Sequence, residues 1–510
     1  MMHGREKSDS AIVAMKPANK AGQPAAERAE RRAGAEGNMV EPRTRRTPSR
    51  ESVPQGLDRV RQAAKARKKE RFTALLHHVS VDLLKDAYSW LKRNAAPGVD
   101  GVTWQDYEQN LEANIVDLHA RVHRGAYRAL PSRRKYIAKP DGRQRPLGIA
   151  ALEDKIVQRA LVEVLNAIYE EDFLGFSYGF RPGRGQHDAL DALAAAITRM
   201  KVNWILDADI QSFFDSVSHD WLVRFVEHRI GDPRVIRLIR KWLKAGVMEE
   251  GVITPTEAGT PQGAVASPLL ANIYLHYVFD LWAQRWRHHH AHGNVILVRY
   301  ADDIVAGFEH EADAQRFLAD LQQRMEKFAL SLHPDKTRLI EFGRHAATNR
   351  ARRDLGKPET FNFLGFTHIC GRSRQGAFQL QRKSRRDRMR AKLRAIKKEL
   401  RRRMHEPILE QGRWLRQVVR GYFAYHAVPT NAASLNAFRH YVEDLWRRTL
   451  KRRSQKDHTT WDRITRLATD FLPTPRVLHP WPDARFAVTH PRWEPNARIG
   501  PVRFCAGGAR

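Results

Sequence analysis

Two adjacent carboxylates lie between two short apolar runs in the second half of the chain. Residues 294–308 read NVILVRYADDIVAGF, in which β-branched residues lead into Asp302-Asp303 and a second apolar run leads out. This pattern predicts a strand, a tight turn and a returning strand. Two acids between buried strands are costly to desolvate unless a metal ion or another cation shares the site. Taken alone, the tetrapeptide Tyr300–Asp303 also fits an ordinary exposed Asp-Asp turn.

A third carboxylate, Asp209, ends another predicted strand. Residues 202–209 read VNWILDAD, and Asp207 and Asp209 point the same way because side chains two apart share a face of a strand. An acid in this place suits a metal ligand, and a helix-capping aspartate is the alternative. Together with Asp302 and Asp303, Asp209 makes the kind of acid set that two Mg²⁺ ions need for nucleotidyl transfer, since carboxylate oxygens suit this hard cation.

A basic hairpin is predicted upstream of these acids. Residues 127–146 read YRALPSRRKYIAKPDGRQRP, with a turn at Asp141-Gly142. Lys139 and Arg145 flank this turn and are donors that the oxygens of a triphosphate favour. A solvated basic hairpin without a ligand is the alternative.

A strongly basic segment follows downstream. Residues 382–403 hold thirteen Lys or Arg and two acids, while Met389, Leu393, Ile396 and Leu400 keep helical spacing. The density and sign of this charge favour a helix that tracks phosphates over a merely solvated helix face. The predicted RNA-binding side chains are Arg385, Arg386, Arg388, Arg390, Lys392 and Arg394.

The composition of the whole chain points to the same class of partner. The 510 residues include 89 Lys or Arg against 57 Asp or Glu, and the net charge of +32 calls for a polyanion such as nucleic acid. The sequence contains no apolar run near the ~20 residues of a membrane span and no secretory signal. The two cysteines, Cys370 and Cys505, exclude a disulfide framework and a CxxC zinc site. We therefore expect a cytoplasmic protein without a membrane partner.

The elements that must position these residues follow from the hydrophobic periodicity. Residues 1–56 show no sustained apolar period and are predicted to be disordered. Besides the strands at 202–209 and 294–308, short strands are predicted at 338–342 and 361–366. Helices are predicted at 154–168, 188–200, 220–230, 234–245, 269–282, 312–330, 414–425 and 435–450, in addition to the basic helix.

Eight sequence blocks between about residues 75 and 368 occur in a characteristic order. They are AAPGVDG, YIAKPDGRQRPLGI, GFSYGFRPGRGQHDAL, ILDADIQSFFDSV, GTPQGAVASPLLANIYL, VRYADDIV, LSLHPDKT and FNFLGF. This set resembles the bacterial group II intron-encoded reverse transcriptases, or maturases, and GYFAYHAVP in the basic helices resembles their thumb, or X domain. The resemblance implies an α+β right-hand polymerase, with fingers and an antiparallel palm sheet over 57–370. A helical thumb over 371–455 and a basic tail over 456–510, a candidate DNA-binding segment, would follow.

The resemblance also implies roles for individual residues of the site. Asp209, Asp302 and Asp303 correspond to the metal-binding acids, with the carbonyl of Ile210 as a further ligand. Because neighbouring side chains diverge along a strand, we expect Asp302 to be the more direct ligand and Asp303 the supporting one.

Other matched positions belong to the nucleotide pocket and the leaving group. Lys139, Arg145 and Gln262 match residues around the incoming nucleotide. Phe214 matches the aromatic residue that blocks a ribose 2′-hydroxyl, with Phe213 as the alternative. Lys336 matches a lysine suggested to protonate the leaving pyrophosphate.

The expected activity is RNA-directed DNA synthesis with two Mg²⁺ ions and dNTPs on an RNA template with a DNA primer. The expected partners are a group II intron RNA and a DNA target, with nucleoid association when the protein is bound to DNA. Two alternatives stay open: an RNA-binding splicing maturase with little polymerase activity, and a free-standing reverse transcriptase used in phage defence. Two isolated cysteines cannot build the metal-binding endonuclease domain of many relatives, so we expect that domain to be lacking.

Overall fold

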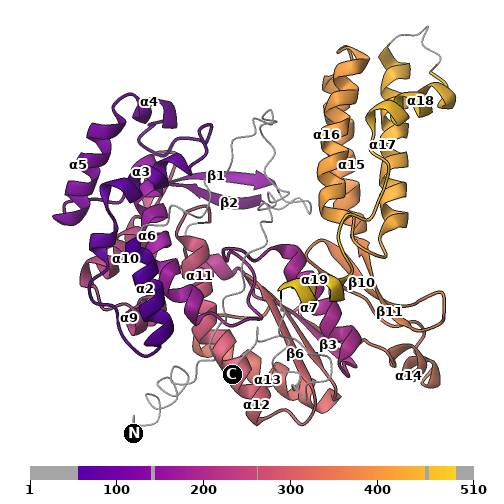
Figure 1. The fold of residues 1–510 in the computed structure, drawn as a ribbon, viewed down its shortest axis with the longest axis horizontal. Helices are drawn as coiled ribbons and strands as arrows, with labels where there is room; N and C mark the ends of the chain where they lie inside the picture. Colours follow the sequence, from indigo (N-terminus) through magenta and orange to yellow (C-terminus); the bar gives the residue numbers. More distant parts are fainter. Residues whose placement is uncertain (1–54, 139–143, 261, 454–458, 490–510) are drawn as a thin grey trace.

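The chain folds around two hydrophobic cores in a mixed arrangement of antiparallel sheets and many helices (Figure 1). The computed structural model describes residues 55–138, 144–260, 262–453 and 459–489. The larger core contains buried residues from Leu57 to Val428, and the second contains buried residues from Ile396 to Leu472. The mixed α and β content agrees with the expected α+β class.

A four-stranded antiparallel sheet carries the acidic residues of interest. Its strand order is β6-β7-β3-β8. The strands are β3 (Trp204–Asp209), β6 (Val295–Tyr300), β7 (Asp303–Phe308) and β8 (Arg338–Glu341). Most residues of β6 and β7 are apolar and buried. The helix α13 (Glu311–Lys327) packs on β3 and β7. The hairpin predicted over 294–308 and the strand predicted over 202–209 are confirmed.

A second four-stranded sheet and a group of helices are formed mainly by residues that precede the hairpin of β6 and β7 in the sequence. The strand order is β2-β1-β4-β5, with β1 parallel to β4. The strands are β1 (Ser132–Ala138), β2 (Gln144–Ile149), β4 (Val247–Glu249) and β5 (Val252–Thr254). The helices are α2 (Gln55–Ala66), α3 (Val81–Ser89), α4 (Trp104–Glu108), α5 (Leu111–His123), α6 (Leu152–Asp172), α7 (Gln186–Arg199), α8 (Phe213–Ser216), α9 (His219–Arg229) and α10 (Pro233–Lys244).

The first described helix, α2, is tied to the core through a buried arginine. It begins at Gln55, inside the segment expected to be disordered, and residues 1–54 lie outside the described residues. Arg229 donates to the carbonyl oxygens of Ala64 (3.1 Å) and Arg67 (3.0 Å) and pairs with Asp172 (3.0 Å). These bonds satisfy carbonyls at the end of α2 that have no partner within the helix.

The single helix expected over 269–282 is interrupted by a π-helix. The chain forms α11 (Ser267–Leu275), the π-helix η3 (His276–Asp280) and α12 (Leu281–His289). Arg324 of α13 donates to the carbonyl oxygens of Tyr277 (3.0 Å) and Val278 (2.9 Å) within this turn. The apolar pattern predicts a continuous helix here because hydrophobicity does not report the wider turn.

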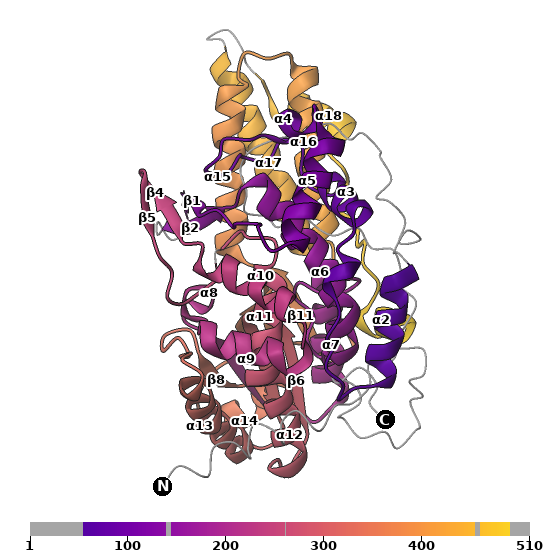
Figure 2. The same ribbon diagram turned by 90° about the vertical axis from the view of Figure 1, so that its left-hand side faces the viewer.

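A third sheet leads to the second core. Its order is β11-β10-β9, formed by β9 (Phe361–Phe363), β10 (Phe366–Arg372) and β11 (Phe378–Ser384), after the short helix α14 (Ala346–Arg352). The helices beyond are α15 (Arg386–Arg402), α16 (Ile408–His426), α17 (Ala432–Arg453) and α18 (Trp461–Phe471). Figures 1 and 2 show α15 to α18 as one group at one end of the molecule. The domain boundary expected at 370/371 falls inside β10.

The described part of the expected tail does not extend away from the rest. The last described helix, α19 (Pro482–Thr489), returns to pack on α7 (Figure 1). Asp191 of α7 forms ion pairs with Arg382 of β11 (2.6 Å) and Arg485 of α19 (2.8 Å). Three segments far apart in the sequence therefore meet at one carboxylate. In the described parts of the chain, no helix is long and apolar enough to cross a membrane.

Candidate catalytic site

The register of the central sheet brings the three predicted acids together. Asp209, at the end of β3, is directly opposite Asp303, at the start of β7. Directly opposed residues in antiparallel strands share a face, with Cβ atoms about 4.5–5.5 Å apart. Asp302 lies in the tight turn between β6 and β7, next to Asp303. Lys336 joins the group, since its Nζ lies 2.6 Å from Oδ2 of Asp209.

The crowding of these acids is visible in the pKa of Asp303. Part of the Asp303 side chain is solvent-exposed, but burial of the carboxyl group is the main cause that raises its pKa. The charges of Asp302 and Asp209 raise the pKa further, and the Lys336 ammonium opposes them. Burial likewise raises the pKa of Asp207, two residues before Asp209, to about 6. A cation placed among these carboxyl groups would relieve their repulsion.

The carboxylate oxygens of these acids are ligands that suit a divalent metal ion. In proteins Mg²⁺ is bound by one or two carboxylates, while waters and substrate phosphates complete its shell. Asp209 and Asp303 share a face of the sheet and supply such a pair. Among the residues that the structure describes, no set of three His, Cys, Asp or Glu side chains is arranged as a complete metal site. The fit therefore rests on the donor type and on the repulsion that a cation would relieve.

The backbone around Ile210 is fixed by an isolated bridge to Leu332. Its hydrogen bonds run from Gln211 N to Ser331 O (2.8 Å) and from His333 N to Asp209 O (2.8 Å). Neither bond uses the carbonyl oxygen of Ile210, the predicted additional ligand. The strand register places Asp303, not Asp302, opposite Asp209. That Asp302 is the more direct metal ligand of the two adjacent acids stays a prediction.

Two of the predicted nucleotide-pocket residues lie on or against β2: Arg145 is part of this strand, and the backbone of Gln262 pairs with it. The carbonyl oxygen of Gln262 accepts a hydrogen bond from Gly148 N of β2 (2.7 Å), and its side-chain Nε2 lies 3.4 Å from the Asp215 carboxylate. Arg145 is exposed on β2, opposite Ile137 of β1. Lys139 lies outside the described residues. Gln262 is thus attached through the backbone to the strand that carries Arg145.

The two aromatic candidates differ in their surroundings. After β3 the chain turns sharply at Ser212, with φ of 46°, into the short helix α8. Phe213 is 3% exposed and packs in the core, whereas Phe214 is only half-buried. The ring of Phe214 meets that of Phe180 edge to face, with centroids 6.4 Å apart. Phe214 is therefore the more accessible of the two aromatic side chains.

The predicted RNA-binding side chains lie on a different element from the acids. Those exposed on α15 are Arg386, Arg388, Arg390, Lys392 and Arg394. Arg385 precedes the helix, is half-buried and pairs with Asp387 (2.7 Å). Arg382, which begins the same basic run, is buried in β11 and belongs to the ion pair with Asp191.

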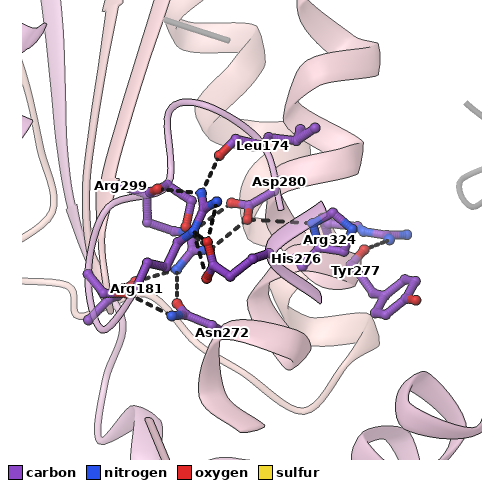
Figure 3. A network of polar contacts seen from close by, with 12 residues as sticks. Leu174, Arg181, Asn272, His276, Tyr277, Asp280, Arg299 and Arg324 are labelled. Carbon is purple, nitrogen blue, oxygen red and sulfur yellow. Dashed lines mark hydrogen bonds and ion pairs between the residues drawn. The ribbon is translucent and has the colours of Figure 1, made fainter. Parts of the chain in front are cut away.

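Sequence reasoning overlooked three residues near the site, of which Gly179 and Arg299 contact the turn carrying Asp302 and Phe180 contacts Phe214. A Cβ atom on Gly179 would lie only 2.3 Å from the backbone N of Ala301, so the loop containing Gly179 contacts the turn directly. Phe180 follows in the same loop, with φ of 61°, and contacts Phe214. Arg299 is buried one residue before Tyr300 (Figure 3). Two features of the sequence could have indicated these residues: the Gly-rich block GFSYGFRPGRG and the charged Arg299 inside an apolar strand.

Comparison with known proteins gives a consistent result. A family model described as reverse transcriptase (RNA-dependent DNA polymerase) matches residues 137–368. Protein YkfC of Escherichia coli (strain K12) is 35% identical over 316 residues, which cover 56% of this chain and 78% of YkfC. Group II intron-encoded protein LtrA of Lactococcus lactis subsp. cremoris is 36% identical over 222 residues, 43% of this chain and 37% of LtrA. An uncharacterized 91 kDa protein in the cob intron of Schizosaccharomyces pombe is 40% identical over 197 residues, 38% of this chain and 24% of that protein.

Proposed function

This chain belongs to the reverse transcriptases, the RNA-directed DNA polymerases that include group II intron-encoded proteins, and we propose that Asp209, Asp302 and Asp303 are its catalytic carboxylates. The main support for this proposal is the strand register, which places Asp209 opposite Asp303. Asp302 is next to Asp303 in the turn. The raised pKa of Asp303, caused by burial and by the neighbouring carboxylates, supports a site made for cations.

The carboxylates of Asp209, Asp302 and Asp303, with the Ile210 carbonyl oxygen, would hold two Mg²⁺ ions. When bound, these ions make the primer 3′-hydroxyl easier to deprotonate and stabilise the charge of the in-line transition state. Lys336, whose Nζ lies 2.6 Å from Asp209, would deliver a proton to the leaving pyrophosphate.

The nucleotide would bind between the β2 strand and the segment after β3. Lys139 and Arg145 would contact the triphosphate, and Gln262 would line the pocket beside them. Phe214 would stand against the sugar and exclude a 2′-hydroxyl, a role supported by its partial exposure and its contact with Phe180. In this arrangement β1, β2, β4 and β5 form the fingers, the central sheet is the palm, and α15 to α18 are the thumb.

The RNA partner proposed for the thumb is a group II intron RNA, in addition to an RNA template with a DNA primer and a DNA target. The exposed cations of α15 support this proposal through their number and their position on a separate helical body. LtrA is named a group II intron-encoded protein, which favours assistance to splicing and mobility as a second task. The crowded acids argue against an RNA-binding maturase with little polymerase activity, because such a site is costly to keep without a cation.

Primer extension on an RNA template tests the catalytic assignment. We expect Asp302→Ala and Asp303→Ala each to abolish Mg²⁺-dependent extension, since each removes a carboxylate from the cation site. RNA binding, measured by filter retention, should stay near wild type. The control is Asp220→Ala, which removes an exposed carboxylate from α9 and should leave extension unchanged. Mg²⁺-dependent extension by the double variant of Asp302 and Asp303 would refute the assignment.

A further inference from the structure

Arg299 lies in β6 directly before the turn, and its guanidinium is fully buried and fully hydrogen-bonded (Figure 3). An arginine side chain has five N–H donors in a fixed planar fork. In Arg299, Nε and Nη2 donate to the two carboxylate oxygens of Asp280 at 2.7 and 2.6 Å. Nη1 donates to Oδ1 of Asn272 at 3.0 Å, and Nη2 donates to Oγ of Ser177 at 2.7 Å.

The fifth bond goes to the turn itself. Nη1 of Arg299 donates to the carbonyl oxygen of Ala301 at 2.9 Å. Ala301 has φ of 57°, in the left-handed region that is unfavourable for a non-glycine residue. Such a conformation persists only where the surroundings determine it. The bond from Arg299 is one of those determinants, and the peptide it fixes leads into Asp302.

The loop before α7 also contacts this turn. Nδ2 of Asn272 donates to the carbonyl oxygen of Gly179 at 2.7 Å, and Gly179 has room only for a hydrogen against Ala301 N. The backbone of this loop pairs with β6 through Arg299 N to Phe176 O (2.8 Å) and Tyr178 N to Arg299 O (2.9 Å). Arg299 and Asn272 therefore hold the turn from the strand side and the loop side together.

The partners of Arg299 are themselves held in place. Asp280 ends the π-helix η3, whose carbonyls Tyr277 and Val278 accept bonds from Arg324. Arg181 donates to the carbonyl oxygens of Leu174 and Ser177, both at 2.8 Å, and so closes the loop that presents the Ser177 hydroxyl. π-helical turns occur frequently at functional sites. Here the π-helix supplies the carboxylate that compensates the buried guanidinium.

We propose that Arg299 is a positioning residue that fixes the Ala301 carbonyl and thereby orients the carboxylates of Asp302 and Asp303 for metal binding. The inference rests on the proposed function, because it assumes that these two acids are the metal ligands. Lysine cannot replace the arginine, since an ammonium is a compact charge without a planar fork. In Arg299→Lys the charge opposite Asp280 stays, but three donors on a single nitrogen replace five donors on a planar fork, so the paired bonds to Asp280 and the bonds to Asn272, Ser177 and Ala301 cannot all be kept.

The experiment compares Arg299→Lys with a matched buried arginine. Arg229 is also buried and also bonds a carboxylate and backbone carbonyls, but those carbonyls belong to the end of α2 and the residues just after it. Arg299→Lys, Arg229→Lys and wild type are compared by thermal unfolding, primer–template affinity, single-turnover extension against Mg²⁺ concentration, and Mn²⁺ binding by electron paramagnetic resonance. Asn272→Ala, which removes the bond to Gly179 and one acceptor of Arg299, replaces Arg299→Lys if that variant does not fold.

We expect Arg299→Lys to slow single-turnover extension by about 10- to 100-fold, because small misplacements of catalytic groups have effects of this size. Its Mn²⁺ affinity should weaken and its half-saturating Mg²⁺ concentration should rise, with primer–template affinity unchanged. Arg229→Lys should lower the unfolding temperature without changing the metal dependence. The proposal is overturned if Arg299→Lys binds Mn²⁺ as wild type does, or if Arg229→Lys shifts the metal dependence equally.

The two failures can be told apart. Wild-type protein that binds Mn²⁺ through Asp302 and Asp303 but extends no primer would refute the proposed function and leave the role of Arg299 to be judged by Mn²⁺ affinity. Wild-type extension with a metal dependence that Arg299→Lys does not change would refute the positioning role alone.

Discussion

Phe213 and Phe214 are adjacent in the sequence, but their side chains have different surroundings. Phe213 packs against Tyr274 in the core, with ring centroids 6.5 Å apart, while Phe214 contacts Phe180 at the edge of the proposed nucleotide pocket. A substitution at each position should therefore change a different property, substrate selection at one and stability at the other.

We expect Phe214→Val to increase incorporation of ribonucleotides relative to deoxyribonucleotides by about 10- to 100-fold, the range available to a pocket that distinguishes one small group. The measurement is single-nucleotide extension with each substrate at matched concentrations. Phe213→Ala is the control and should cost about 3–5 kcal/mol of unfolding free energy because it leaves a cavity in the core. Unchanged selectivity in Phe214→Val would contradict the proposed role.

For single residues, the sequence alone predicts a role when the features that indicate it are close together in the chain. The Asp302-Asp303 turn could be predicted because its acids and its flanking apolar runs are contiguous, and Lys336 could be placed only through the family resemblance. The role of Arg299 could not be predicted, because its partner Asp280 lies on another element and nothing in the sequence pairs them. Gly179 is visible in the sequence as a glycine, but its contact with Ala301 depends on how the loop packs.

Among the elements, α15 combines a buried apolar stripe with exposed cations. Ile396 and Leu400 face the second core, and the cations project from the rest of the helix. If these cations contact RNA phosphates, each contact releases counterions and adds to the salt dependence of binding.

We expect the triple variant Arg388→Gln, Arg390→Gln and Lys392→Gln to bind RNA more weakly and with a flatter dependence of log K on log salt. The slope should change by about 0.7–0.9 for each phosphate that the variant no longer neutralises. Arg382→Gln is the control, since it removes a cation of the same basic run that is buried against Asp191. It should reduce stability and leave the slope unchanged, and an unchanged slope in the triple variant would contradict phosphate tracking.

The element boundaries show what periodicity can and cannot supply. Amphipathic helices such as α13 and the strands of the central sheet follow the apolar pattern, with small shifts at their ends. The basic run from residue 382 is harder to predict, because its first residues complete β11 and only the pairing with β10 reveals a strand. The interruption by η3 could not be predicted from periodicity, since Tyr277, Val278 and Phe279 continue the apolar pattern of α11 and a buried His276 or Asp280 does not indicate a wider turn.

For the whole molecule, the junction between the two cores contains buried histidines. His368 of β10 is stacked on Phe361, with ring centroids 4.6 Å apart, and His426 ends α16 with Nδ1 3.2 Å from Oγ of Ser384. Burial lowers the pKa of each histidine to about 3. Both rings are therefore neutral in the folded protein at pH values where an unfolded chain begins to protonate them.

This difference gives the pH dependence of stability a definite sign. Since the folded pKa lies below the ordinary value of about 6.5, each histidine leaves stability unaffected above pH 6.5 and reduces it as the pH falls toward 3. At pH 5 the reduction is about 2 kcal/mol for each histidine. We expect His426→Gln to lose less unfolding free energy between pH 7 and pH 5 than wild type, measured by denaturant titration. His405→Gln, at an exposed position, should keep the wild-type dependence, and equal reductions in all three proteins would contradict the assignment.

The π-helix η3 also makes chain length a determinant of the site. Successive residues of a regular helix are rotated by about 100°, so a helix that gains or loses one residue turns everything beyond it by that angle. Asn272 of α11 and Asp280 at the end of η3 both reach Arg299 with the wide turn between them. In a regular helix, residues 272 and 280, eight positions apart, would be rotated by about 80° from each other, so only one of the two side chains could face the guanidinium if η3 became regular at the same chain length. A one-residue deletion within η3 would instead bring the two side chains within about 20° of each other on a regular helix, so the wide turn is what accommodates the extra residue between Asn272 and Asp280.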